Sequence, residues 1–330
     1  MKRHRSWVEV NERALVHNIE TLRSLLESGS RFCAVLKANA YGHGLDEVAS
    51  IAARAGVDAF AVDSIDDALT LRTLFPSALV ITLGYTMLDR FKEALLANIH
   101  LTIYDRGGIE HAQAVGRELA KTFPIHLKVE TGTMRQGVAI DDLPDLTRLL
   151  RESDRVSLEG LSTHFANIED SDDPEFAAHQ FSLYEQARAI LTENGLTPQW
   201  CHCACSAAII LYPQTHKTLV RAGISMYGIW SSELVENTVR RLNLGCELQP
   251  VLTWKSRVAQ IKSISMGTPI GYGLTEMMKR GGRLAIVPVG YWDGYDRLLS
   301  SCGEVLIKGS RCKVMGRVCM NMMIVDVSQI

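Results

Sequence analysis

Residues 32–44 read FCAVLKANAYGHG, an apolar run that ends on a lysine and is followed by a tyrosine and two glycines. The apolar run is typical of a buried strand. Lys37 would then lie at the end of that strand, where burial favours the neutral amine, a group that can attack an aldehyde and form a Schiff base. A lysine paired with a carboxylate is the alternative for this segment, because buried strands also end on polar residues for structural reasons.

Segments with the patterns of strands and helices alternate from this stretch onward. Eight strands are predicted near residues 35, 60, 80, 102, 127, 160, 203 and 222, with helices between them over 45–55, 89–97, 109–121, 143–151 and 174–194. One more helix is predicted after Ser64, its N-cap, with Asp67 three residues later. Eight such units imply a closed (β/α)8 TIM barrel. An open doubly wound sheet would need a Gly-x-Gly-x-x-Gly turn after an early strand, and the sequence has none.

The pattern changes near Leu244. Short alternating or apolar segments follow at 252–258, 284–287, 304–307 and 312–315, and glycine-rich turns separate them. Short strands with glycine-rich turns are typical of an all-β domain. We therefore expect a barrel over residues 1–243 and a smaller β domain over residues 244–330.

The composition is that of an ordinary soluble globular protein. The chain has 330 residues, of which 47% are hydrophobic and 22% charged, and its net charge is -2. This balance predicts no binding to nucleic acid. No apolar stretch has the roughly 18 residues of a membrane span, so we expect a cytoplasmic chain without membrane contact of its own. The same composition would suit the cytoplasmic domain of a longer membrane protein.

The eight cysteines are expected to be reduced thiols, because the N-terminal segment lacks the features of a secretory signal. Cys201, Cys203 and Cys205 alternate along a predicted strand. Residues two apart on a strand share one face, so the three thiols would form a row and could not surround a tetrahedral ion. No metal site is predicted.

Polar residues gather at the predicted strand ends, where (β/α)8 barrels carry their functional groups. These residues are Lys37, Tyr41, Lys128, Arg135, His164, Ser206, Arg221, Gly223 and Ile224. Each alone has a structural explanation, such as a helix-capping serine or a surface arginine. Their gathering at one end of one barrel indicates an active site. The last two strands are followed by Ser206, Gly223 and Ile224, at the place where such barrels often bind phosphate.

The run VLKANAYGHG at 35–44 is very similar to the pyridoxal-phosphate lysine motif of bacterial alanine racemases, and the similarity extends over almost the whole chain. The resemblance implies that Lys37 carries pyridoxal 5'-phosphate and acts as one base. It also implies phosphate contacts from Tyr41, Ser206, Gly223 and Ile224.

In the segment VRAGISMYG at 220–228, the resemblance implies a hydrogen bond from Arg221 to the pyridine nitrogen. A guanidinium does not give up its proton, so the ring nitrogen stays unprotonated and withdraws fewer electrons than a protonated ring. A weaker electron sink should disfavour side reactions such as transamination.

Racemisation needs a base on each face of the α-carbon, and one lysine cannot reach both. The resemblance assigns the second base to Tyr272, contributed by the partner subunit of a homodimer, with His164 and Arg221 in a hydrogen-bonded line to it. It places Arg135 near the phenolic oxygen and the substrate carboxylate, and Lys128 matches a lysine that in the family is often carbamylated to hold that arginine. A turn aromatic beside two glycines is the structural alternative for Tyr272.

Other substrate contacts implied by the resemblance lie near the C-terminus, where Tyr291 matches the entry tyrosine and Met320 a backbone donor to the substrate carboxylate. The sequence also departs from the family pattern. Residues 130–137 read ETGTMRQG where the family usually has DTGMGRLG, Cys205 replaces an asparagine, and Asn321 replaces an aspartate. The family generally continues for some tens of residues past the position of Ile330 and places another phosphate-contacting tyrosine there.

Asn321 suggests the substrate, because an amide offers donors where a carboxylate only accepts, which suits a substrate hydroxyl. In these changes the sequence resembles the catalytic domains of racemases that accept serine. Those racemases are linked to glycopeptide resistance, and their catalytic domain is fused behind a membrane domain. We therefore predict racemisation of serine and alanine, supplying D-amino acids for peptidoglycan precursors. A housekeeping alanine racemase without serine activity is the alternative.

Three other classes of protein fit the sequence less well. A non-catalytic pyridoxal-phosphate carrier resembles the barrel alone, and the second domain with Tyr272 argues against it. Amino-acid decarboxylases with a similar barrel are usually longer and carry a cysteine-containing motif that is not found here. A barrel hydrolase would leave the motifs of Lys37 and Arg221 unexplained.

Overall fold

The computed structural model describes residues 4–330 and divides into two compact units. One is Val10–Val251, and the other joins the described residues before Val10 with Leu252–Ile330. The N-terminal residues belong to the second unit because β1 (Ser6–Val10) pairs with β10 (Leu252–Ser256). The boundary expected at residues 243 and 244 falls just after α10 (Glu233–Leu242), and the barrel unit continues from there to Val251.

Eight parallel strands form the sheet of the barrel unit, in the order β8-β7-β6-β5-β4-β3-β2-β9. They are β2 (Arg31–Val35), β3 (Ala59–Val62), β4 (Leu79–Thr82), β5 (His100–Ile103), β6 (Phe123–Lys128), β7 (Val156–Ser162), β8 (Trp200–His202) and β9 (Leu219–Ala222). The two outer strands of this order approach each other, since the N–H of Thr218 donates to the Cys201 carbonyl (3.2 Å) and that of Arg221 to the Ala204 carbonyl (3.0 Å). The predicted (β/α)8 barrel is confirmed.

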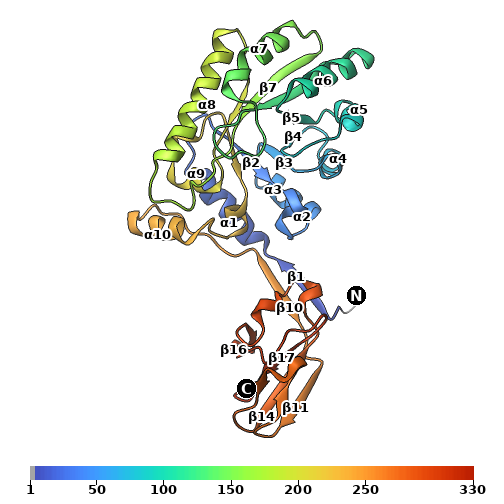
Figure 1. Ribbon diagram of the computed structural model, residues 1–330, viewed down its shortest axis with the longest axis vertical. Helices are drawn as coiled ribbons and strands as arrows, with labels where there is room; N and C mark the ends of the chain where they lie inside the picture. Colours follow the sequence, from blue (N-terminus) through green and yellow to red (C-terminus); the bar gives the residue numbers. More distant parts are fainter. Residues whose placement is uncertain (1–3) are drawn as a thin grey trace. The chain divides into compact units, whose positions relative to one another are not determined.

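Helices lie outside the strands of this unit (Figure 1). They are α1 (Glu12–Ser24), α3 (Leu45–Arg54), α4 (Ile65–Leu74), α5 (Phe91–Leu96), α6 (Arg106–Glu118), α7 (Leu143–Glu152), α8 (Glu175–Glu193) and α9 (Ser206–Leu211), with α2 (Lys37–Tyr41) described below. The predicted N-cap of α4 is present, because the Ser64 hydroxyl accepts from the backbone N–H of Asp67 at 3.1 Å. Helices α1, α9 and α10 were not predicted.

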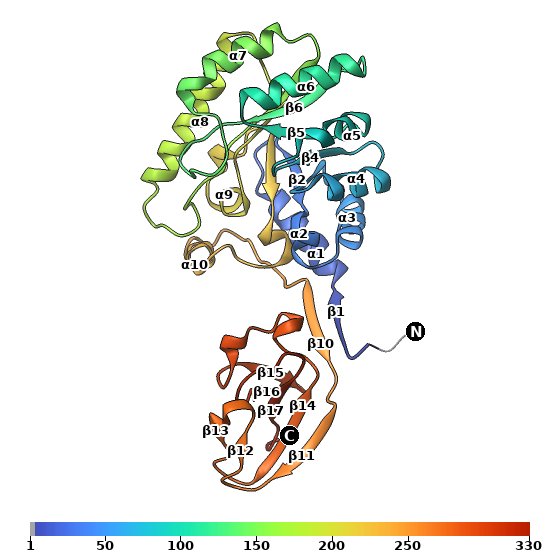
Figure 2. The same cartoon turned by 45° about the vertical axis from the view of Figure 1, so that its right-hand side comes forward.

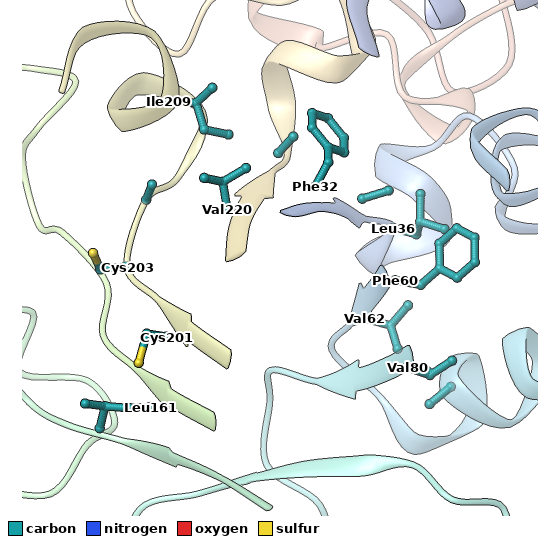
Figure 3. Packing of buried hydrophobic residues seen from close by; sticks show 14 of the residues in the cluster. Phe32, Leu36, Phe60, Val62, Val80, Leu161, Cys201, Cys203, Ile209 and Val220 are labelled. Carbon is teal, nitrogen blue, oxygen red and sulfur yellow. The ribbon is translucent and has the colours of Figure 1, made fainter. Parts of the chain in front are cut away.

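The two faces of the strands bury different sets of side chains. On β2, Phe32 and Ala34 belong to the large cluster that packs against the helices, while Cys33 and Val35 belong to a smaller cluster inside the barrel. Figure 3 shows members of the large cluster, such as Phe60 and Val220, along the strands and the neighbouring helices. This two-sided burial explains why strands such as β2, β3 and β4 are nearly continuous apolar runs.

The second unit is an all-β fold, as predicted. An antiparallel sheet has the order β11-β14-β17, from β11 (Gln260–Ile264), β14 (Gly282–Val287) and β17 (Met323–Asp326), and it is visible in Figure 2. Two hairpins accompany it, β12 (Pro269–Ile270) with β13 (Glu276–Met277), and β15 (Glu304–Ile307) with β16 (Ser310–Lys313). Within residues 4–330, no helix combines the length and the apolar character needed to cross a bilayer.

Candidate active site

Lys37 begins a left-handed turn. The three residues after it, Ala38, Asn39 and Ala40, and then Tyr41 all have φ between 53° and 54°. L-residues in this conformation cost roughly 1–2 kcal/mol each, so the turn must be held by its surroundings. The Asn39 side-chain oxygen accepts from the N–H at the start of α3 (2.9 Å), and the apolar Ala40 is fully buried. The turn brings the side chains of Lys37 and Tyr41 to one cavity.

That cavity, of about 700 Å³, lies at the carboxyl ends of the strands. Its lining includes all nine residues that the sequence placed at the strand ends, from Lys37 and Tyr41 to Gly223 and Ile224. Among the described residues, no group of three or more His, Cys, Asp or Glu side chains is arranged to hold a metal ion. Cys201 and Cys203 are buried free thiols.

One end of the cavity is a cradle for an anion. The Ser206 hydroxyl oxygen accepts from the backbone N–H groups of Gly223 (3.0 Å) and Ser225 (3.3 Å), which leaves its proton free to donate. A Cβ atom at position 223 would lie 2.7 Å from the Tyr41 hydroxyl. Tyr41 is in turn held by Tyr227, whose ring centroid is 4.9 Å away. These groups fit the phosphate of pyridoxal phosphate, with Lys37 on the same cavity for its aldehyde.

Arg221, on β9, is buried among carbonyls and an imidazole. Its guanidinium donates to the carbonyl oxygens of His202 (2.6 Å) and Thr163 (2.8 Å), and Nη1 lies 2.6 Å from Nδ1 of His202. No ion pair within residues 4–330 includes Arg221. The guanidinium therefore brings to the cavity that it lines a positive charge with no carboxylate paired directly to it.

His164 lies beside this guanidinium, with 3.4 Å between its Nδ1 and Nη2 of Arg221. Burial, followed by the positive charges of Arg221 and Arg135, lowers the pKa of His164 to about 3. The imidazole is thus neutral near pH 7. Since arginine only donates, Nδ1 is the acceptor and the proton lies on Nε2, where it can be donated to another group.

Lys128 lies buried at the end of β6, close to cations. Burial, with Arg135 and Arg221 as the next causes, lowers the pKa of Lys128 to about 8. Arg135 is exposed on a loop held by Glu130, whose carboxylate accepts from the N–H groups of Gly132 (2.6 Å) and Arg135 (3.2 Å). Burial raises the pKa of Glu130, but these backbone donors outweigh it and the pKa is lowered. The loop residue Met134 has φ +50° where the family pattern has glycine.

Four predicted site residues belong to the other compact unit. Tyr272 is 70% exposed on the turn between β12 and β13, and the Glu276 carboxylate that follows it accepts from the N–H of Gly316 (2.8 Å). The segments of Tyr291 and Met320 are neighbours, because the N–H of Tyr291 donates to the Cys319 carbonyl (3.1 Å). Met320 is exposed and Asn321 partly exposed. The roles assigned to these four residues stay predictions.

The sequence reasoning missed the histidines behind Arg221. His126 and His202 are fully buried, with 2.8 Å between Nδ1 of the first and Nε2 of the second. A signal was available, since His126 precedes Lys128 by two residues on β6 and therefore shares its face. The cavity is also lined by Gln136, Glu169 and Ser231, for which spacing offered no signal.

Comparison with known proteins matches both units to one family. Residues 10–231 match the family model of the alanine racemase N-terminal domain, and residues 251–330 match that of the alanine racemase C-terminal domain. The chain belongs to the alanine racemase family. Pyridoxal phosphate is the cofactor of this family, as expected from the sequence.

Individual members of the alanine racemase family resemble the chain over nearly its whole length. An alanine racemase of Desulforamulus reducens is 37% identical over 326 residues, which are 98% of this chain and 86% of the relative. The alanine racemase structure of Clostridium difficile 630 superposes with a TM-score of 0.93 at 30% identity, covering 100% of this chain and 85% of the other. That of Bartonella henselae, with covalently bound pyridoxal phosphate, has a TM-score of 0.86 at 26% identity, covering 99% and 87%.

Proposed function

We propose that this protein is a pyridoxal-phosphate-dependent racemase that interconverts L- and D-alanine by two-base proton transfer. The observation that carries the proposal is the cavity itself, in which Lys37, the anion cradle at Ser206 and Gly223, and the guanidinium of Arg221 line one space. Membership of the alanine racemase family supports the same activity. D-Alanine made in this way would supply peptidoglycan precursors.

When bound, pyridoxal phosphate supplies an electron sink that makes the α-proton of an amino acid more acidic. Ser206, Gly223, Ile224 and Tyr41 would hold its phosphate. Lys37 would bind its aldehyde and then move the α-proton on one face of the substrate. Arg221 would donate a hydrogen bond to the ring nitrogen without giving up its proton, and so limit the loss of product to transamination.

A second base is required on the opposite face of the α-carbon, and we assign it to Tyr272 of a second copy in a homodimer. The proton on Nε2 of His164 can stabilise the deprotonated phenol, because Arg221 occupies the other ring nitrogen. The exposure of the Tyr272 side chain leaves it available to such a partner. Arg135, Tyr291, Met320 and Asn321 would bind the substrate.

Lys128 is proposed to be carbamylated. With a pKa of about 8, about one molecule in ten carries the neutral, reactive amine at pH 7. Carbamylation replaces a buried cation near Arg135 and Arg221 by an anion, which removes the repulsion that lowers the pKa of the lysine. The carbamate would then hold the side chain of Arg135.

Serine is the second candidate substrate, on the strength of Asn321, whose amide can donate to a substrate hydroxyl. The relatives are named alanine racemases, so serine activity and a link to glycopeptide resistance stay predictions.

The test is racemisation of L-alanine and L-serine in parallel, with holoenzyme checked by its cofactor absorbance and Lys37→Ala as the control. Turnover of alanine that is lost in the control supports the racemase. Cofactor binding without turnover of either substrate would refute it and favour a carrier. Turnover of alanine alone would remove serine from the proposal.

A further inference from the structure

Three imidazoles continue from the buried guanidinium through the interior of the barrel. Nδ1 of His202 lies 2.6 Å from Nη1 of Arg221, Nε2 of His202 lies 2.8 Å from Nδ1 of His126, and Nε2 of His126 lies 3.2 Å from Nδ1 of His100. His126 and His202 are fully buried, whereas His100, the first residue of β5, lines a separate cavity of about 430 Å³ together with Glu159. The row thus runs from the active site to the opposite end of the strands.

The hydrogen bonds in this row can run in one direction only. Arginine has no acceptor, so Nδ1 of His202 must accept and its Nε2 must carry the proton. That proton can be donated only to Nδ1 of His126, whose own Nε2–H then donates to His100. Burial lowers the pKa of all three imidazoles, in agreement with neutral rings. Each neutral ring therefore turns its acceptor toward Arg221 and its donor away.

The neighbouring strand is shaped to receive the central ring. The register between β6 and β7 shifts after Ile125, so that His126 lies opposite Gly160. A Cβ atom at position 160 would lie 2.2 Å from Nδ1 of His126, so only glycine leaves room for the ring in this position. The bulge and the glycine indicate that the place of His126 is built into the barrel.

We propose that His202, His126 and His100 form a one-way chain of neutral imidazoles that solvates the Arg221 guanidinium in place of a carboxylate. A carboxylate would neutralise the arginine, whereas aligned dipoles stabilise the cation and leave its full charge at the cavity. His126 and His100 are then positioning residues for the arginine that faces the cofactor ring. The positioning role toward the cofactor ring rests on the proposed function, whereas the row of hydrogen-bonded imidazoles does not depend on it.

The chain of imidazoles is tested first without cofactor, by NMR of the full-length protein labelled with 15N-histidine. We expect three neutral rings with unprotonated Nδ1 atoms, and slowly exchanging Nε2–H protons on His126 and His202. His100→Leu, which removes the terminal acceptor, should shift the ring signals of both buried histidines. His100→Asn, which has the shape of leucine but keeps an acceptor near the place of Nδ1, should restore them. A charged ring among the three, or a proton on Nδ1 of His126 or His202, would refute the one-way chain of neutral imidazoles.

The positioning role is tested with the same two variants as holoenzymes. His100→Leu should lower kcat between about twofold and tenfold, the factor expected for one neutral hydrogen bond, with KM unchanged and the cofactor absorption band shifted. His100→Asn should recover most of the loss. Equal behaviour of the two variants in kcat and absorbance would overturn the positioning role. If the wild-type protein racemises nothing, the proposed function fails while the NMR result still decides the chain.

Discussion

Replacing Gly223 by alanine should weaken the binding of pyridoxal phosphate. The added Cβ would lie 2.7 Å from the hydroxyl oxygen of Tyr41, closer than a carbon and an oxygen can approach. Tyr41 cannot simply move away, because its ring packs against Tyr227, whose hydroxyl donates to the Val35 carbonyl at 3.0 Å. The methyl group must therefore displace a group that we assign to the phosphate.

Losing one hydrogen bond to a charged phosphate costs about 1.5–3 kcal/mol, which corresponds to an increase in Kd of roughly ten- to more than a hundredfold. The Kd is measured by titrating the cofactor-free enzyme with pyridoxal phosphate and following absorbance. Gly107→Ala is the matched control, because position 107 is exposed in α6 and its nearest neighbour would be 3.6 Å from the new Cβ. An unchanged Kd for Gly223→Ala, with normal activity, would refute the assignment of the phosphate to this cradle.

Three further predictions concern residues outside the cradle. Met134→Gly should raise the free energy of unfolding by about 0.5–1 kcal/mol in urea titrations, because the exposed Met134 holds φ +50° at a cost that glycine avoids. A lower free energy of unfolding would show that the backbone at position 134 is not strained. Lys128→Met, in buffer free of carbon dioxide, should raise that free energy by about 1–3 kcal/mol at pH 7, where the buried lysine is mostly charged. The pKa of Lys128 falls from 10.5 to about 8 on folding, so the destabilisation by the buried charge is complete below pH 8 and vanishes as the pH rises toward 10.5. If Lys128→Met stabilised the protein as much at pH 10 as at pH 7, the buried charge would not be the cause. Tyr272→Phe should lower racemisation about a hundredfold or more while exchange of the α-proton with deuterated water persists for one enantiomer only; exchange of both would exclude Tyr272 as the second base.

The strands of the barrel were predictable because their signal is local. Strands such as β2, β3 and β4 are short apolar runs, and burial on both faces leaves that mark in the sequence itself. Helices with a clear cap or a clear end, such as α4 and α8, were predictable for the same reason. Helix α9, with six residues between a strand and a turn, offers too short a pattern to be recognised.

The left-handed turn after Lys37 was not predictable from local sequence patterns. Alanine ordinarily adopts a right-handed conformation, and asparagine visits the left-handed region only as a single residue, so the propensities of Ala38, Asn39 and Ala40 do not predict a run of residues with φ near 54°. The turn depends on contacts with α3 and on the burial of Ala40, which exist only in the folded barrel. The motif therefore identified Lys37 correctly as a residue of the cavity without predicting the backbone that places it there.

By itself, the sequence determined the class of fold, the two-domain order and the residues at the strand ends, because periodicity and motif spacing are properties of neighbours along the chain. Only the tertiary structure decided what surrounds Arg221. The groups that contact it or continue from it come from β5, β6, β8 and the end of β7, and their hydrogen-bond directions follow from an arginine that can only donate. Such an arrangement depends on which strands become neighbours in the closed barrel, and no local pattern records that.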